Sequence, residues 1–289
     1  MKTKFLIGIL AVVIGIIGSV IVLASENALV VHPKGIVAQN ELELIVVNII
    51  LMLIIIVPTY ILLFSVVWKY CIKNEKAKYD PDHTFGPIGE LMMWGLPTIV
   101  VIVMAIVTWD ATHELNPYKP LESDVKPLVV QVVALDWKWL FIYPEQGIAT
   151  LNYFFIPERT PIHLHLSADG TPMNSFWIPQ LGGQIYSMTG MTTQLFLMAD
   201  GLGEYTGRAV EINGEGYADM TFPVKSTSAQ DFADWVELVK KSPSHLTGDL
   251  YNELVKPAVN KSTIFFSEVE SNLYNKILDK YMYPTEPVL

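Results

Sequence analysis

Cysteine is almost absent from this chain, which has only Cys71 among its 289 residues. A single cysteine excludes an internal disulfide and any metal cluster built on several thiolates. Charged residues are few as well, at 17%, whereas hydrophobic residues make up 51%, which is high for a soluble domain. Positive charge is also scarce, since the net charge is −10 and residues 110–289 hold 22 acidic against 12 basic side chains. This balance argues against nucleic acid as a partner.

Ionisable residues are missing from three long apolar runs near the N-terminus. They are Phe5–Ala24 with 20 residues, Leu44–Trp68 with 25 and Leu91–Trp109 with 19. Each is long enough to cross the ~30 Å hydrocarbon core of a bilayer as a helix. The segment 69–90 between the last two runs carries four lysines, which predicts a cytoplasmic loop by the positive-inside rule. We therefore expect a transmembrane helix hairpin over residues 41–110, with everything after it on the outer side.

The first apolar run has two interpretations, and both remain open. Residues 1–24 have a short basic start, an apolar stretch and small residues at Val22 and Ala24, as a cleaved signal peptide does. The same run is also long enough to be retained as an extra transmembrane helix.

Beyond the hairpin, the pattern changes to short β-rich runs. Residues 111–127 contain three prolines and read as a linker. Residues 128–225 then predict an antiparallel sandwich or barrel, and residues 226–289 predict a helical extension whose first helix is N-capped by Ser228. The expected strands are Leu128–Ala134, Trp137–Tyr143, Ile148–Ile156, Pro161–Leu166, Asn174–Ile178, Gln184–Ser187, Thr192–Met198, Gly203–Ile212 and Tyr217–Val224.

Three stretches carry a resemblance to a known family: Asp136–Thr150, Met173–Met191 and Gly207–Met220. Through them the chain resembles subunit II of the haem–copper respiratory oxidases, and in particular that of the bacterial cytochrome bo-type ubiquinol oxidases. The resemblance runs from about Pro33 to about Met282. It implies a membrane-anchored α+β chain, in which transmembrane helices precede a cupredoxin-like Greek-key β-barrel with a C-terminal helical extension.

The copper-bearing members of this family hold a binuclear copper centre, and its ligands are largely replaced here. The family pattern has two thiolates four residues apart, an imidazole four residues later and a thioether three after that, with a further His before a Ser-aromatic pair. The matching positions are Asn174, Ala209, Asn213, Tyr217 and Met220. Only the Met220 thioether remains, together with a Glu at position 211 that the copper family shares. The resemblance thus implies a chain without its own copper centre, since copper pairs need soft thiolate and imidazole ligands.

The resemblance also bears on lipidation. Relatives carry a lipid-anchored cysteine ahead of a Pro-Lys-Gly sequence, whereas this chain has Glu26 near that place and keeps the following His32-Pro-Lys-Gly35. The lipid anchor therefore does not carry over.

Two further groups of residues attract a functional interpretation. Trp137 and Trp139 are expected to share one face of a strand, with Lys138 opposite, and to serve either internal packing or a subunit interface. His163 and His165 are expected to share a strand face too. We interpret the two histidines as an exposed pair, because no third metal ligand is evident near them. The methionines of this region are interpreted as core residues.

The function implied by the resemblance is that of subunit II in a proton-translocating quinol oxidase of the bacterial inner membrane, with its large C-terminal domain in the periplasm. Such a complex oxidises ubiquinol and reduces O₂ to water. Haems, catalytic copper and quinol chemistry are expected in subunit I, and this chain is expected to cover the outer face of that subunit without catalytic, cofactor or metal residues of its own. Its partners would be subunit I, the other subunits, ubiquinol as the substrate of the complex, and membrane lipid. The alternative, which the Met and His content allows, is a membrane-anchored periplasmic copper-handling domain independent of an oxidase.

Overall fold

The structure is a computed structural model that describes residues 15, 18–19, 21–25, 28–71, 74, 86–259 and 262–282. Most of residues 1–24, Glu26 and the greater part of the expected cytoplasmic loop 69–90 lie outside the described residues. The chain divides into two compact units, of which one is Leu42–Asn116 and the other combines Met1–Glu41 with Pro117–Leu289. The two units are described separately below.

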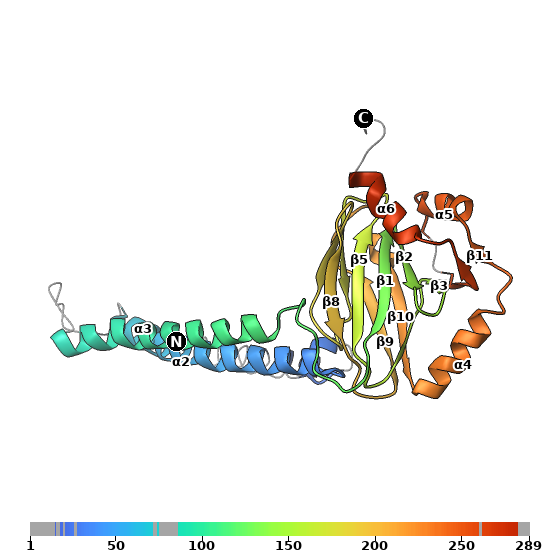
Figure 1. Cartoon of the computed structure of the whole chain (residues 1–289). Helices are drawn as coiled ribbons and strands as arrows, with labels where there is room; N and C mark the ends of the chain where they lie inside the picture. The colour runs from blue at the N-terminus through green and yellow to red at the C-terminus, as the bar shows by residue number, and fades with distance from the viewer. Residues whose placement is uncertain are drawn as a thin grey trace. The chain divides into compact units, whose positions relative to one another are not determined.

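Two helices contain the second and third apolar runs. Helix α2 spans Ile36–Lys69 and helix α3 spans Gly86–Glu114 (Figure 1). Apolar side chains lie on all sides of both helices and are almost all exposed. A helix that is apolar all round requires an apolar environment. Among the described residues, these are the two helices that are long and apolar enough to cross a membrane. Both extend beyond the apolar runs, since their polar ends continue the same helical backbone.

The second unit is built on two packed β-sheets (Figure 1). One sheet has six strands in the order β12-β3-β2-β1-β5-β8, and the other has five in the order β4-β10-β9-β6-β7. A short pair, β11 with β13, is separate. The strands are β1 Leu128–Leu135, β2 Lys138–Tyr143, β3 Ile148–Leu151, β4 Phe154–Pro157, β5 Ile162–Ala168, β6 Met173–Trp177, β7 Ile185–Met188, β8 Thr193–Leu197, β9 Gly203–Ala209, β10 Thr221–Thr227, β11 His245–Leu246, β12 Ile264–Phe266 and β13 Glu268–Val269.

The expected fold class is confirmed: apolar N-terminal helices precede a cupredoxin-like β-sandwich with C-terminal helices. Two details of the prediction were wrong. The sheets are mixed, because β1 pairs in parallel with β5 and β10 pairs in parallel with β4. The run Ile148–Ile156 is two strands that belong to different sheets, since the backbone turns at Asn152, where φ is +54°. A left-handed φ at a non-glycine residue breaks a strand and is best tolerated by asparagine.

An aromatic cluster fills the space between the sheets. Trp139 meets Phe176 and Phe222 edge-on, with ring centroids 5.3 and 5.7 Å apart, and Phe141 stacks on Phe154 at 4.8 Å. A Cβ on Gly207 would lie 2.1 Å from the Phe222 ring, so only glycine fits against this ring. The space between the two sheets is therefore tightly filled by aromatic side chains.

The C-terminal extension wraps the outside of the sandwich. Helix α4 (Ala229–Val239) is capped as expected, since the Ser228 hydroxyl accepts the backbone N–H of Asp231 at 3.1 Å, and its Trp235 stacks on Phe155 at 4.5 Å. Strand β12 then joins the six-stranded sheet beside β3, which a purely helical prediction did not include. Helices α5 (Gly248–Val255) and α6 (Leu273–Met282) lie at the end of the domain opposite α4 (Figure 1).

Candidate functional site

Three of the five positions that match copper ligands meet inside the sandwich. Asn174 lies in β6, Ala209 ends the neighbouring strand β9, and Met220 stands just before β10. The Ala209 backbone N–H donates to the Met220 carbonyl at 3.0 Å. The Asn174 side-chain amide donates from Nδ2 to the Met220 sulfur at 3.2 Å. All three residues are buried, with exposed fractions of 0%, 6% and 1% in chain order. The fold thus gathers the positions as a metal-binding fold would, although the side chains differ.

The chemistry of the gathered groups does not suit a copper pair. The Met220 sulfur, the one retained ligand atom, already accepts the Asn174 amide, and the other Asn174 polar atom accepts the backbone N–H of Ser175 at 3.1 Å. Copper pairs require anionic or imidazole ligands, and none of the three side chains gathered here is of that kind. Within the described part of the chain, no group of three or more His, Cys, Asp or Glu side chains comes together. An amide–thioether contact therefore fills this position.

The other two positions lie on the loop between β9 and β10. Asn213 buries both of its side-chain polar atoms without a hydrogen-bond partner among the residues described. Tyr217 starts a short 3₁₀ turn, Tyr217–Asp219, where a strand was expected, and it is half-buried. Glu211 is also half-buried. These three loop residues therefore supply neither the thiolate nor the imidazole that a copper pair requires.

The two tryptophans have separate surroundings, so the expectation of a shared strand face was wrong. Trp137 has φ of +59° and precedes β2, whereas Trp139 lies in β2 and is fully buried in the aromatic core. Trp139 is therefore unavailable to a partner subunit. Trp137 instead covers the loop, because a Cβ on Gly216 would lie 2.5 Å from its ring and one on Gly214 3.0 Å from it. The Trp137 indole N–H is buried, and no residue in the described part of the chain accepts it.

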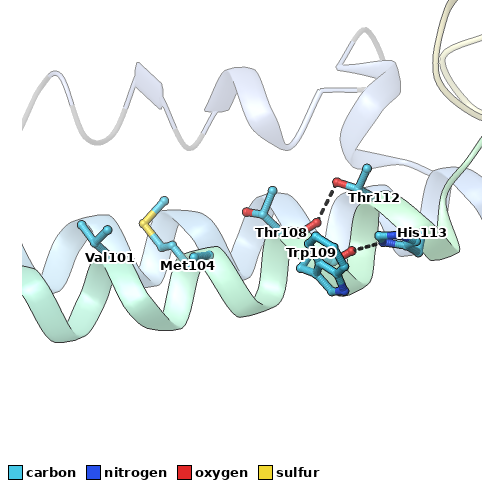
Figure 2. A pocket seen from close by; sticks show the side chains of 7 residues that line it. Val101, Met104, Thr108, Trp109, Thr112 and His113 are labelled. Carbon is cyan, nitrogen blue, oxygen red and sulfur yellow. Dashed lines mark hydrogen bonds between the residues drawn. The ribbon is translucent and has the colours of Figure 1, made fainter.

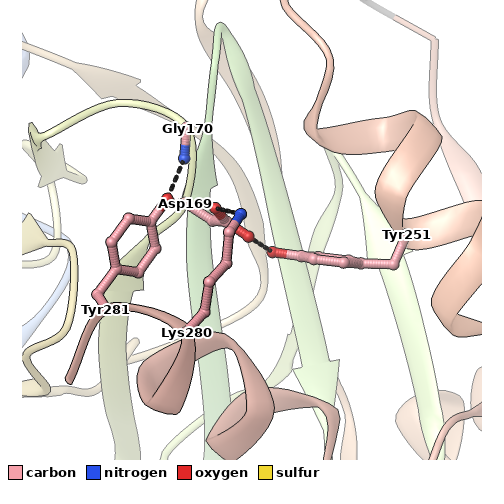
Figure 3. A network of polar contacts seen from close by, with 5 residues as sticks. All are labelled: Asp169, Gly170, Tyr251, Lys280 and Tyr281. Carbon is pink, nitrogen blue, oxygen red and sulfur yellow. Dashed lines mark hydrogen bonds and ion pairs between the residues drawn. The ribbon is translucent and has the colours of Figure 1, made fainter. Parts of the chain in front are cut away.

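A buried carboxylate that sequence reasoning missed ties the C-terminal extension to the barrel (Figure 3). Asp169, just after β5, is 0% exposed. Its Oδ2 accepts the Tyr251 hydroxyl at 2.7 Å, and its Oδ1 accepts Tyr281 at 2.6 Å and the Lys280 ammonium at 2.8 Å. The Tyr281 oxygen also accepts the backbone N–H of Gly170 at 3.1 Å. We call these four side chains the Asp169 cluster; it connects β5 to both α5 and α6.

The electrostatics of the Asp169 cluster follow from burial and from the carboxylate. Burial raises the pKa of the Tyr251 hydroxyl, and the charge of Asp169 raises it further. Burial lowers the pKa of Lys280, but the hydrogen bond and charge of Asp169 outweigh this effect and leave that pKa raised. Burial and Asp169 raise the pKa of Tyr281 as well, so both tyrosines stay protonated as donors, and the lysine stays charged. The sequence could not predict this cluster, because the partners lie 82 to 112 residues from Asp169 along the chain.

His163 and His165 share a face of β5 as predicted, but both are half-buried and not exposed as expected. Burial lowers the pKa of the His165 imidazole, and the neighbouring His163 lowers it further. The methionine interpretation was only partly right, since Met220 is in the core whereas Met173 and Met191 are 36% and 52% exposed.

An apolar groove runs along α3 in the other unit, with a volume of about 510 Å³ (Figure 2). Two of its polar side chains hydrogen-bond to the helix backbone. The Thr112 hydroxyl donates to the Thr108 carbonyl at 2.7 Å, and His113 Nδ1 lies 2.8 Å from the Trp109 carbonyl. The surface of the groove is mainly apolar. Its lining residues are Val101, Met104, Ala105, Thr108, Trp109, Thr112 and His113.

The chain is similar to known subunits of respiratory oxidases. The family model described as COX Aromatic Rich Motif matches residues 240–285, the segment that supplies α5, α6 and most of the Asp169 cluster. The chain is 44% identical to cytochrome bo(3) ubiquinol oxidase subunit 2 of Pseudomonas aeruginosa, over 86% of this chain and 75% of that one. It is 41% identical to ubiquinol oxidase subunit 2 of Acetobacter aceti, over 97% and 91%. The periplasmic domain of cytochrome oxidase subunit II of Bradyrhizobium japonicum is 21% identical and covers 43% of this chain and 98% of its own, with a TM-score of 0.40.

Proposed function

We propose, since the chain belongs to the ubiquinol oxidase subunit 2 family, that it is subunit II of a quinol oxidase that oxidises ubiquinol, reduces O₂ to water and translocates protons. The observation that carries this proposal is the contact between Asn174 and Met220, which fills the copper position with an amide and a thioether. An oxidase that takes electrons from a water-soluble donor needs a metal acceptor outside the membrane. Quinol delivers electrons within the bilayer, so a subunit II without copper ligands suits a quinol donor.

The role of this chain in the complex is structural. Haems, catalytic copper and quinol chemistry reside in subunit I, and this chain covers the outer face of that subunit without catalytic or cofactor-binding residues. The apolar groove on α3 supports contact with a partner helix or lipid, because its lining is mainly apolar. At the loop between β9 and β10, Trp137 is the aromatic residue that remains available for a subunit interface.

The proposed membrane topology rests on the two apolar helices and on the lysines of the segment between them. The transmembrane hairpin lies in a bacterial inner membrane over residues 41–110, and its helices α2 and α3 extend past these bounds to Ile36 and Glu114. Loop 69–90 lies in the cytoplasm. The linker 111–127, whose first residues continue α3, leads to a periplasmic barrel at 128–225 and its extension at 226–289. Residues 1–24 are a signal peptide or a further helix, and Glu26 stands near the place of the lipid-anchored cysteine of relatives.

The test is purification of the complex from membranes through a tag on this chain. We expect haem to co-purify with a single copper ion, and O₂ uptake to occur with ubiquinol and not with reduced cytochrome c. Activity with cytochrome c and three coppers would contradict the proposal. Tight Cu(I) binding without haem would support the copper-handling alternative instead.

A second prediction tests whether the loop between β9 and β10 still has a backbone geometry that can bind copper once ligand side chains are restored. The combined substitutions Asn174→His, Ala209→Cys, Asn213→Cys and Tyr217→His, with Met220 retained, are expected to restore bound copper. The physical reason is that Asn174, Ala209 and Met220 already meet inside the fold. The measurement is copper content together with visible thiolate-to-copper absorption.

The matched control for that variant omits only Ala209→Cys, which removes one bridging thiolate and should abolish the copper pair. A folded four-residue variant that binds no more copper than the control would show that the loop geometry itself has diverged.

A further inference from the structure

We propose that His163 and His165 form a chelating site for a transition-metal dication, Zn²⁺ or Cu²⁺, on the outer face of the six-stranded sheet. The two histidines alternate along β5 with Ile162, Leu164 and Leu166, which are fully buried between the sheets. The imidazoles therefore point away from the core. The Asn174–Met220 contact belongs to the other sheet, so this site is distinct from the position that copper occupies in relatives.

The two rings are close enough for one metal ion to bind both of them. His165 Nε2 lies 3.4 Å from His163 Nδ1. This separation exceeds the usual range of about 2.7 to 3.2 Å for a nitrogen donor. Two imidazole nitrogens that each lie about 2.0 to 2.1 Å from a tetrahedral metal are about 3.3 to 3.4 Å apart. The nitrogens thus already have the separation that a shared metal ion requires, without movement of the backbone.

The surroundings of His163 hold its ring in the form that a ligand needs. The Nε2–H of His163 donates to the side-chain carbonyl of Gln194 at 2.9 Å, so Nδ1 accepts the long contact from His165 Nε2–H. A metal ion would replace this contact once His165 carries its proton on Nδ1. The ring also stacks on Phe196, with centroids 4.1 Å apart and planes 13° apart. Metal-ligating histidines commonly donate their second N–H to such a carbonyl, because this fixes both tautomer and orientation. His163 is therefore preorganised before any metal arrives.

The remaining ligands would come from oxygen atoms. Gln131 on β1 and Gln194 on β8 are the register partners of His165 on either side. All three are half-buried on the same face. The Gln131 side-chain carbonyl and water can complete the shell of a dication bound by two imidazoles, while the Gln194 carbonyl keeps its hydrogen bond with His163 Nε2–H. Among such ions the general order of affinity places Cu²⁺ above Zn²⁺.

The experiment uses the whole complex after treatment with a chelator, followed by equilibrium dialysis against Zn²⁺ and against Cu²⁺. We expect the wild-type complex to bind one dication more than the His163→Ala or His165→Ala complex, with at least about tenfold weaker affinity in each variant. Gln194→Ala keeps both imidazoles and should weaken binding by about tenfold through loss of ring orientation alone. The matched control is His245→Ala, an exposed histidine on β11, which should leave binding unchanged.

A measurement on the wild-type protein does not depend on whether a variant folds. The electron paramagnetic resonance spectrum of added Cu²⁺ should show coupling to two imidazole nitrogens in the wild-type complex. Wild-type complex that takes up no additional dication, or equal binding by wild type and both histidine variants, would overturn the proposal. Coupling to a single nitrogen would overturn it as well. Quinol oxidase activity monitors assembly in parallel, so failure of the proposed function is seen separately from failure of this site.

Discussion

Replacing Asp169 with alanine is expected to lower the free energy of unfolding of the β-sandwich domain by about 3 kcal/mol or more, because each hydrogen bond to a charged group contributes about 1.5 to 3 kcal/mol. The carboxylate is fully buried and accepts two tyrosine hydroxyls and an ammonium group. Its removal leaves the buried Tyr251 hydroxyl without an acceptor, and an unsatisfied buried polar group costs its full desolvation free energy. The measurement is chemical denaturation of the purified chain in detergent, combined with hydrogen exchange. Exchange should increase first in α5 and α6, since they are the elements that Asp169 holds.

Lys280→Ala provides the matched control for this cluster. The Lys280 side chain is 54% exposed, and Lys280→Ala leaves Asp169 with both tyrosine donors, so its cost should be smaller than that of Asp169→Ala. Tyr251→Phe should lie between the two, because it removes one buried hydrogen bond and keeps the ring. Equal losses in Asp169→Ala and Lys280→Ala would show that the ion pair, and not the buried hydrogen bonds, connects the extension to the barrel.

Trp139→Ala is the second substitution with a large expected effect, a loss of about 3 to 5 kcal/mol in the free energy of unfolding. The indole is fully buried and contacts Phe176 and Phe222, so its removal leaves a cavity between the two sheets. Such a loss is a large part of the stability of an ordinary domain. We expect little assembled oxidase from this variant, measured as haem recovered through a tag on the chain.

The neighbouring Trp137→Ala separates packing from assembly. Trp137 lies over Gly214 and Gly216 at the surface of the barrel, so its loss should destabilise folding less than the loss of Trp139. If Trp137 contacts a partner subunit as proposed, haem recovery should fall while the denaturation midpoint stays close to that of the wild type. Unchanged haem recovery in a stable Trp137→Ala chain would show that Trp137 is not part of the subunit interface.

The family was readable from the sequence, because the motifs that carry it depend on local residue identity. The positions 209, 213, 217 and 220 lie within one loop, so their spacing is visible in the chain. The two helices were predictable for a similar reason, since an uncharged apolar run of sufficient length has one stable environment. Most strands were found from their apolar alternation. Strand breaks at Trp137 and Asn152 were missed, because a left-handed backbone leaves no mark in the hydrophobic pattern.

Contacts between distant segments were decided by the tertiary structure alone. Asn174 and Met220 meet across 46 residues, and Asp169 meets Tyr281 across 112. The parallel pairing of β1 with β5 likewise joins segments whose register no local pattern specifies. In the case of His163 and His165, the sequence determined that the side chains share a face. Only the packed sheet determined that Gln194 and Phe196, from another strand, hold the two imidazole nitrogens 3.4 Å apart. Hydrogen bonds and ring contacts act over a few ångströms, so such sites exist only once the fold brings their members together.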